Sequence, residues 1–142
     1  MRLLSKLRTF LSFSSPDRWR VCEAAILLGL ARLAVVTVPF RFLAPMLARS
    51  PETASCDEDM VQAVSRAVRN AARNVPWKAV CLPQAIAAKI MLARRGCGSA
   101  CHIGATFDPD GKVIAHAWLS AGGKVVLGGE ESAGMSPLAR FG

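Results

Sequence analysis

Helical spacing of apolar residues dominates the first two thirds of the chain. The segment 15–17 combines a capping residue, a proline and an acid, which is typical of a helix start, and the apolar run that follows extends to about residue 36. Pro39 ends this helix, and residues 40–48 predict a short second one. Residues 1–14 show a mixture of basic and apolar positions, which we interpret as a loose start of the chain.

Two further helices are predicted before residue 96. Apolar positions recur at helical spacing over about 57–74, and Ser55 with Glu58 forms a capping-box pattern at its start. The next helix covers about 81–95 and ends at Gly96. Because proline is tolerated only in the first turn of a helix, Pro83 places the start of this helix at Cys81 or Leu82.

After residue 96 the pattern changes to short strands. Residues 100–107, 112–119 and 124–128 predict three strands, separated by the turn at 108–111 and by the hairpin loop at 121–123. The tail from residue 129 is expected to be irregular. The predicted fold class is therefore α+β, with N-terminal helices followed by an antiparallel β-meander.

The length of 142 residues predicts one domain, 1–142. The net charge of +8 is uneven, because residues 1–49 hold eight Arg and Lys against Asp17 and Glu23. We divide the domain into a basic, apolar, helical N-terminal part, 1–50, and a catalytic core, 51–142. The N-terminal part indicates an anionic partner or a peripheral membrane contact, with a solvated basic face as the alternative. Nucleic acid is not expected, because no binding motif is present.

The cysteines and the apolar segments indicate a cytoplasmic protein, with membrane association as an option. Five cysteines at irregular spacing favour free thiols over a disulfide framework: Cys22, Cys56, Cys81, Cys97 and Cys101. Their spacing does not fit a zinc site, so no metal and no cofactor are expected. Residues 1–20 lack a convincing secretion signal, and arginines interrupt the apolar stretch 24–48 too early for a membrane span.

Cys81 and His116 carry the candidate chemistry. A cysteine attacks a carbonyl as the thiolate, which a helix N-terminus and a nearby imidazolium stabilise. Cys81 lies at a predicted helix start, whose N–H groups also suit an oxyanion, and His116 lies in the second predicted strand. The order of cysteine and then strand histidine is typical of transglutaminase-like and papain-like hydrolases. Taken singly, each residue is also compatible with a structural role in the core.

Several segments together resemble the leader-peptidase domain of the B protein of lasso-peptide biosynthesis. They are Glu23-Ala24-Ala25-Ile26-Leu27-Leu28, Val38-Pro39-Phe40-Arg41, Cys81-Leu82-Pro83-Gln84-Ala85, Leu92-Ala93-Arg94-Arg95-Gly96, Ile103-Gly104 and Ala115-His116-Ala117-Trp118. The resemblance implies a transglutaminase-like/papain-like cysteine peptidase that removes the leader from a ribosomal precursor. A separate ATP-dependent lasso cyclase would then form the macrolactam. Cys81 would be the nucleophile and His116 the general base.

Position 128 departs from the family pattern. The family commonly has an aspartate twelve residues after the histidine, whereas this chain has Gly128. With a loop at 121–123, residue 116 would face 128, so an aspartate there would lie beside the imidazole. Three replacements stay open: Glu130 on a continuing strand, Asp108 or Asp110 from the neighbouring turn, or a backbone carbonyl or side-chain amide.

Three further residues are candidates for the site. Gln84 can assist an oxyanion or be a solvent-facing helix residue. Trp118 shares the parity of His116 and can shelter the dyad or pack in the core. Trp77 can line the substrate groove or anchor its loop.

The partners follow from the resemblance. Some family members carry an additional precursor-recognition domain, for which this chain has no room. We therefore expect a separate recognition protein that holds the leader peptide, or direct leader binding by the N-terminal part. Two rival functions are acyl transfer by the same Cys–His pair and a non-catalytic adaptor that binds precursor or membrane.

Overall fold

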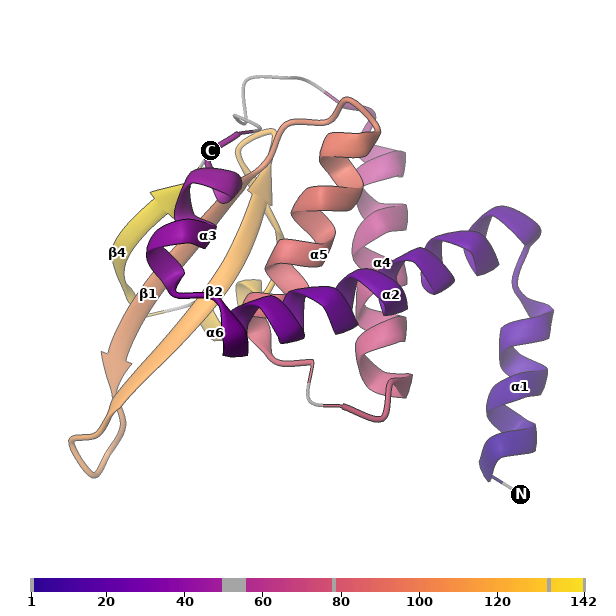
Figure 1. The fold of residues 1–142 in the computed structure, drawn as a ribbon, viewed down its shortest axis with the longest axis horizontal. Helices are drawn as coiled ribbons and strands as arrows, with labels where there is room; N and C mark the ends of the chain where they lie inside the picture. Colours follow the sequence, from indigo (N-terminus) through magenta and orange to yellow (C-terminus); the bar gives the residue numbers. More distant parts are fainter. Residues whose placement is uncertain (1, 50–55, 78, 133, 142) are drawn as a thin grey trace.

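The computed structural model describes residues 2–49, 56–77, 79–132 and 134–141 of the chain (Figure 1). Helices come first and strands follow. In chain order the elements are α1 (Arg2–Ser12), α2 (Ser15–Thr37), α3 (Phe40–Leu47), α4 (Glu58–Asn74), α5 (Cys81–Arg94), β1 (Ala100–Phe107), β2 (Val113–Ala121), β3 (Lys124–Leu127), α6 (Gly129–Ser132) and β4 (Ser136–Phe141). The predicted α+β class, helices before an antiparallel sheet, is confirmed.

The strands form one antiparallel sheet in the order β3-β2-β1-β4. α5 packs against β2 and β1, and both α2 and α4 pack against α5, so the helices form a layer on one side of the sheet (Figure 1). The core lies between these layers and includes Leu28, Val68, Met91, Leu92 and Leu119. The start of α5 lies near the first half of β2 and the end of β3, because Cys81, residues 114–117 and residues 127–128 border one cavity.

Two segments differ from the sequence prediction. The start of the chain is a helix, α1, because its leucines repeat at helical spacing. The tail is also structured: α6 follows Gly128, and β4 pairs with β1. Pairing with β4 satisfies backbone groups on β1 that would otherwise lie at an open sheet edge.

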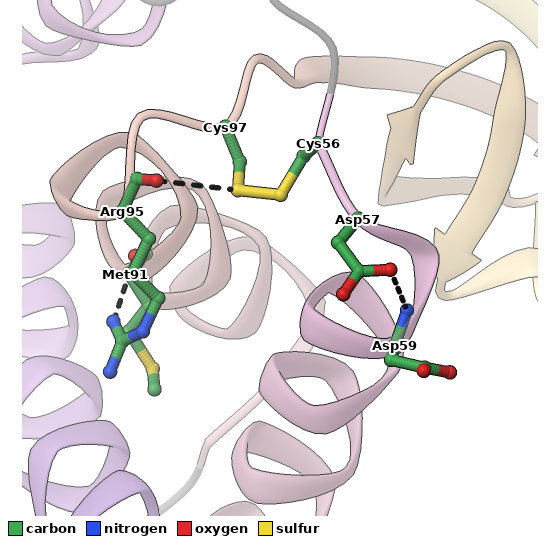
Figure 2. Close-up of a disulfide and its surroundings, with 6 residues drawn as sticks. All are labelled: Cys56, Asp57, Asp59, Met91, Arg95 and Cys97. Atoms are coloured by element: carbon green, nitrogen blue, oxygen red, sulfur yellow. Dashed lines mark hydrogen bonds between the residues drawn. A yellow bond between two sulfur atoms is a disulfide. The ribbon is translucent and has the colours of Figure 1, made fainter.

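The start of α4 also differs from the predicted pattern. Asp57 is the N-cap, and its side chain accepts a hydrogen bond from the backbone N–H of Asp59 at 3.3 Å (Figure 2). The proposed capping residue Ser55 lies outside the described residues.

The hairpin between β2 and β3 has a different register from the expected one. Ala121 pairs with Lys124, so the loop consists of Gly122 and Gly123 alone. A bulge between Leu119 and Ser120 then shifts the pairing, so that Leu119 lies opposite Leu127. Because β3 ends at Leu127, position 128 is no longer a strand residue.

Cys56 and Cys97 form a disulfide, contrary to the expectation of five free thiols (Figure 2). The bond joins the residue before α4 to the segment between α5 and β1 across 41 positions of sequence. The sequence pattern could not show this pairing, because irregular spacing does not tell which cysteines the fold brings together. Cys22, Cys81 and Cys101 are free.

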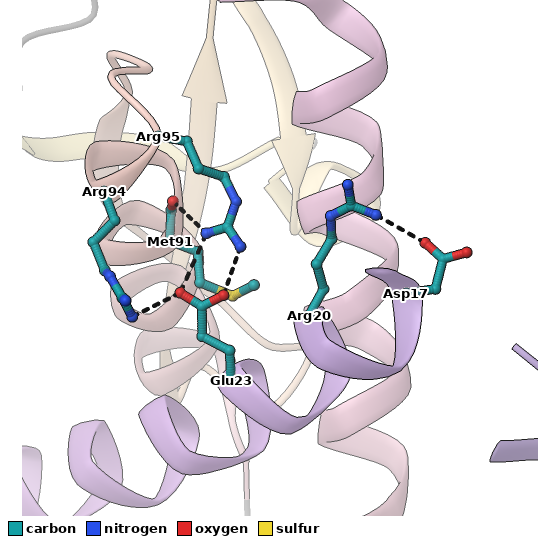
Figure 3. Close-up of polar contacts among 6 residues, drawn as sticks. All are labelled: Asp17, Arg20, Glu23, Met91, Arg94 and Arg95. Atoms are coloured by element: carbon teal, nitrogen blue, oxygen red, sulfur yellow. Dashed lines mark hydrogen bonds and ion pairs between the residues drawn. The ribbon is translucent and has the colours of Figure 1, made fainter. Parts of the chain in front are cut away.

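A half-buried carboxylate, that of Glu23, joins α2 to the end of α5. Glu23 accepts hydrogen bonds from Arg94 at 2.9 Å and from Arg95 at 2.6 Å (Figure 3). The hydrogen bond from Arg95 is the main reason that the pKa of Glu23 lies below its ordinary value, with the charges of both arginines adding to it. Among the described residues, none of the helices combines the length and the hydropathy that a membrane span needs.

Candidate active site

Cys81 is the first residue of α5, and the start of this helix is unusually open. The N-cap residue is Val80, which makes no side-chain capping hydrogen bond. The first intrahelical bond runs from the N–H of Gln84 to the carbonyl of Val80 at 3.2 Å, and Pro83 has no N–H. The N–H groups of Cys81 and Leu82 are therefore left without intrahelical partners, and they are suited to stabilise negative charge on a thiolate or an oxyanion.

His116 lies on β2, and its ring is oriented by the main chain. Its Nε2 lies 3.1 Å from the carbonyl oxygen of Gly128. Since a carbonyl only accepts hydrogen bonds, Nε2 carries the proton in the neutral ring, which leaves Nδ1 as the basic nitrogen. A backbone carbonyl is thus in place as the acceptor, one of the three options open from the sequence.

Position 128, whose carbonyl accepts the hydrogen bond from His116, favours glycine. Its φ is +76°, which favours glycine. A Cβ at this position would lie 3.0 Å from Nε2 of His116, 3.0 Å from the carbonyl oxygen of Ala117 and 3.1 Å from Cβ of Trp118. With this backbone an aspartate at 128 would be strained at positive φ, and its Cβ would crowd the ring that it is expected to orient.

The carboxylates considered from the sequence lie in other arrangements. Glu130 does not follow on a continuing strand, because β3 ends at Leu127 and α6 begins at Gly129, although the exposed Glu130 does line the same cavity as His116. Asp108 accepts hydrogen bonds from the N–H groups of Asp110 and Lys112 in the β1–β2 turn. That turn lies at the far tip of the hairpin, so the expectation that Asp108 or Asp110 orients His116 is wrong (Figure 1).

Cys81 and His116 line one cavity of about 610 Å³. Its other walls come from α4, β2 and the segment after β3, and include Arg69, Arg73, Gln84, Ala115, Ala117, Gly128, Glu130 and Met135. Between these two described residues there is no hydrogen bond from Sγ of Cys81 to the imidazole ring, although both line the same cavity. Catalytic hydrogen bonds of this kind often tighten only when substrate binds.

A family profile described as Transglutaminase-like superfamily matches residues 24–140. The chain belongs to the transglutaminase-like superfamily. Comparisons with curated proteins and with solved structures returned no match. The matched range contains both the start of α5 and the strand that carries His116.

The three free cysteines differ in their surroundings. Cys81 is half-buried and lines the cavity. Cys101 is fully buried in the core, and this burial raises its pKa to about 11, so it stays a neutral thiol at physiological pH. Among the described residues, no group of three or more His, Cys, Asp or Glu side chains is arranged to hold a metal ion.

The remaining sequence candidates occupy three different places. Gln84 lines the cavity, and its amide Nε2 donates to the carbonyl of Ala79 at 2.6 Å, which holds the loop in front of Cys81. Trp118 is buried and stacks on His116 with ring centroids 6.4 Å apart, so it backs the imidazole. Trp77 does not line the cavity, and its indole lies against Gly29 of α2, which corrects the expectation of a groove residue.

Two arginines in the cavity wall were missed from the sequence. Arg69 and Arg73 lie one helical turn apart on α4, and both line the cavity. Arg69 donates to the carbonyl of Val126 at 3.0 Å and so ties α4 to β3. The amphipathic spacing of α4 places both arginines on its polar face. Nothing in the local pattern shows that this face lies beside Cys81.

Proposed function

We propose that this protein is a cysteine peptidase that removes the leader from a ribosomal lasso-peptide precursor. Membership of the transglutaminase-like superfamily supports a cysteine peptidase or acyltransferase type of chemistry. The observation that carries the proposal is the cavity shared by Cys81, at an uncapped helix start, and His116, oriented by the Gly128 carbonyl. The lasso assignment rests on the sequence segments that resemble the leader peptidases.

The proposed reaction uses these groups in two steps. When the precursor fills the cavity, Nδ1 of His116 takes the proton of the Cys81 thiol, and the thiolate attacks the carbonyl carbon at the leader–core junction. The N–H groups of Cys81 and Leu82 bind the oxyanion, the C–N bond breaks, and the imidazolium gives its proton to the leaving core amine. Water, deprotonated by His116, then attacks the thioester and releases the leader acid.

The proposal includes the partners of the reaction. The precursor leader is the substrate, a separate recognition protein holds it, and a lasso cyclase uses the new amine. Residues 51–142 carry the reaction, and residues 1–50 provide part of the core through α2.

The decisive test is mass spectrometry of a candidate precursor incubated with the protein, with and without the recognition protein. We expect one cut that yields intact leader and core, and we expect Cys81→Ala to abolish it. Cys22→Ala is the matched control, because Cys22 is also a free, half-buried cysteine but does not line the cavity. Normal turnover by Cys81→Ala would disprove the proposal.

The same samples separate the rival functions. A product in which the acyl group is joined to an amine rather than to water would indicate acyl transfer. A cysteine-reactive probe distinguishes an adaptor, because Cys81 should react faster than Cys22 and Cys101 in a peptidase and no faster in an adaptor.

A further inference from the structure

The helix α1 has an apolar face bordered by cations on both sides. At 100° per residue, Leu3, Leu4, Leu7, Phe10 and Leu11 occupy an arc of about 120°. Lys6 lies just beyond one border of this arc and Arg8 beyond the other. The opposite side carries Ser5, Thr9 and Ser12, and two of these hydroxyls bond to backbone carbonyls of the same helix.

The body of the molecule does not cover this apolar face. α1 makes few contacts with other elements and projects away from the helical layer (Figure 1). The exposed fractions of Leu3, Leu4, Leu7 and Leu11 are 85, 71, 57 and 59%. Trp19, near the start of α2, is 80% exposed. Four exposed leucines on one face of a short helix form an apolar patch of the kind that marks an interaction surface.

The charges around this face have one sign. The region has two acids, and each is already paired: Asp17 with Arg20 at 3.0 Å, and Glu23 with Arg94 and Arg95 (Figure 3). Three cations on α1 and in the first turn of α2 form no ion pair within the described part of the chain: Lys6, Arg8 and Arg18. The occupant of the apolar face therefore meets an uncompensated positive field.

We propose that α1 lies in the plane of an anionic lipid bilayer and anchors the protein to it. The leucine arc enters the boundary between headgroups and acyl chains, while Lys6 and Arg8 at its borders extend to the lipid phosphates. Trp19 joins at the headgroup level, where tryptophan is enriched. Eleven residues span only about 16 Å, so α1 lies on the bilayer rather than crossing it.

The test is flotation of the full chain with vesicles. Vesicles of phosphatidylcholine and phosphatidylglycerol at 3:1 should carry the protein, and pure phosphatidylcholine vesicles should carry at least about tenfold less. The double variant Leu4→Glu/Leu7→Glu should lose binding to both, and Lys6→Gln/Arg8→Gln should remove the preference for the anionic lipid. Leu138→Glu is the matched control, because Leu138 is 68% exposed but lies on β4.

Two further measurements serve as controls for the vesicle-binding test. Circular dichroism of each variant should match the parent, since α1 contributes little to the core. Size-exclusion chromatography over a range of concentrations tests the other occupant, a second copy of this chain. The anchor is refuted by absent vesicle binding, by unchanged binding of Leu4→Glu/Leu7→Glu, or by a dimer that this variant abolishes without any vesicle binding. None of these readouts requires peptidase activity.

Discussion

Gly128 is the residue on which the candidate site depends most closely. Its carbonyl holds Nε2 of His116, and its lack of a side chain leaves room for the ring. A carbonyl differs from a carboxylate in carrying no net charge, so it fixes the tautomer of the ring but stabilises the imidazolium less.

We predict that Gly128→Ala lowers kcat/KM of cleavage by about 10- to 100-fold, because a methyl group 3.0 Å from Nε2 must displace the ring. Positive φ also costs stability, about 1 kcal/mol for alanine. Gly111→Ala provides the control, since Gly111 has φ +78° with nothing near its Cβ position. Equal activity of the two variants, measured on the same precursor, would show that the contact with His116 is not important.

At the residue scale, the sequence predicted which side chains belong to the candidate site, but not which main-chain atoms contact them. Cys81 and His116 were identified from their types and their positions in a helix start and a strand. The acceptor at Gly128 was only one option among three. Every residue has a backbone carbonyl, so the sequence does not show which of them accepts the hydrogen bond from the ring. The bulge after Leu119 and the end of β3 at Leu127 moved Glu130 off the expected strand, and no pattern marks either event.

Helix α2 is fixed to α5 by a carboxylate that the arginines keep ionised. Because the folded pKa of Glu23 is lowered, its contribution to stability is present above its unfolded value of 4.5 and is lost as the pH falls through the folded pKa. Glu23 and Arg95 are largely shielded from water, so this pair is screened less than a surface ion pair.

Glu23→Gln should therefore lower the free energy of unfolding by about 1–2 kcal/mol at pH 7, measured by urea titration. Below pH 4.5 the curves of the variant and the parent should converge. Glu58→Gln serves as the comparison, because the pair of Glu58 with Lys124 is exposed on both sides and should contribute less than about 0.5 kcal/mol. A constant difference at all pH values would contradict the assigned cause.

The elements themselves were largely predictable. Strong amphipathic spacing located α4, and Pro83 with Gly96 located both ends of α5. The elements that were missed, α1 and β4, depend on information outside their own sequence. β4 exists because β1 offers an open edge, and the helical spacing in α1 was obscured by basic residues that we interpreted as a loose terminus.

At the scale of the whole molecule, the Cys56–Cys97 disulfide closes a loop that contains all of α4 and α5. By the chain-entropy relation, a closure over 41 positions stabilises the folded state by about 4 kcal/mol at most. Cys97 follows the end of α5, whereas Cys81 is its first residue, so the bond acts on stability rather than on the chemistry.

We expect Cys56→Ser/Cys97→Ser to unfold at a lower urea concentration than the parent, by an amount equivalent to about 2–4 kcal/mol. A reductant should move the parent to the same midpoint and leave the variant unchanged. Insensitivity of the parent to reductant would mean that the bond does not form in solution. Thiol trapping in intact cells then tests the cytoplasmic location, since a reducing compartment disfavours such a bond.

The two outer strands of the sheet determine how this protein avoids aggregation. At one edge, β3 has only four residues and begins with Lys124. At the other edge, β4 carries Pro137, which has no N–H to offer, and Arg140, which places a charge along the edge. Neither edge is a good template for a further strand, so crowded molecules should not polymerise through the sheet. Any self-association at high concentration should instead begin at the exposed leucines of α1.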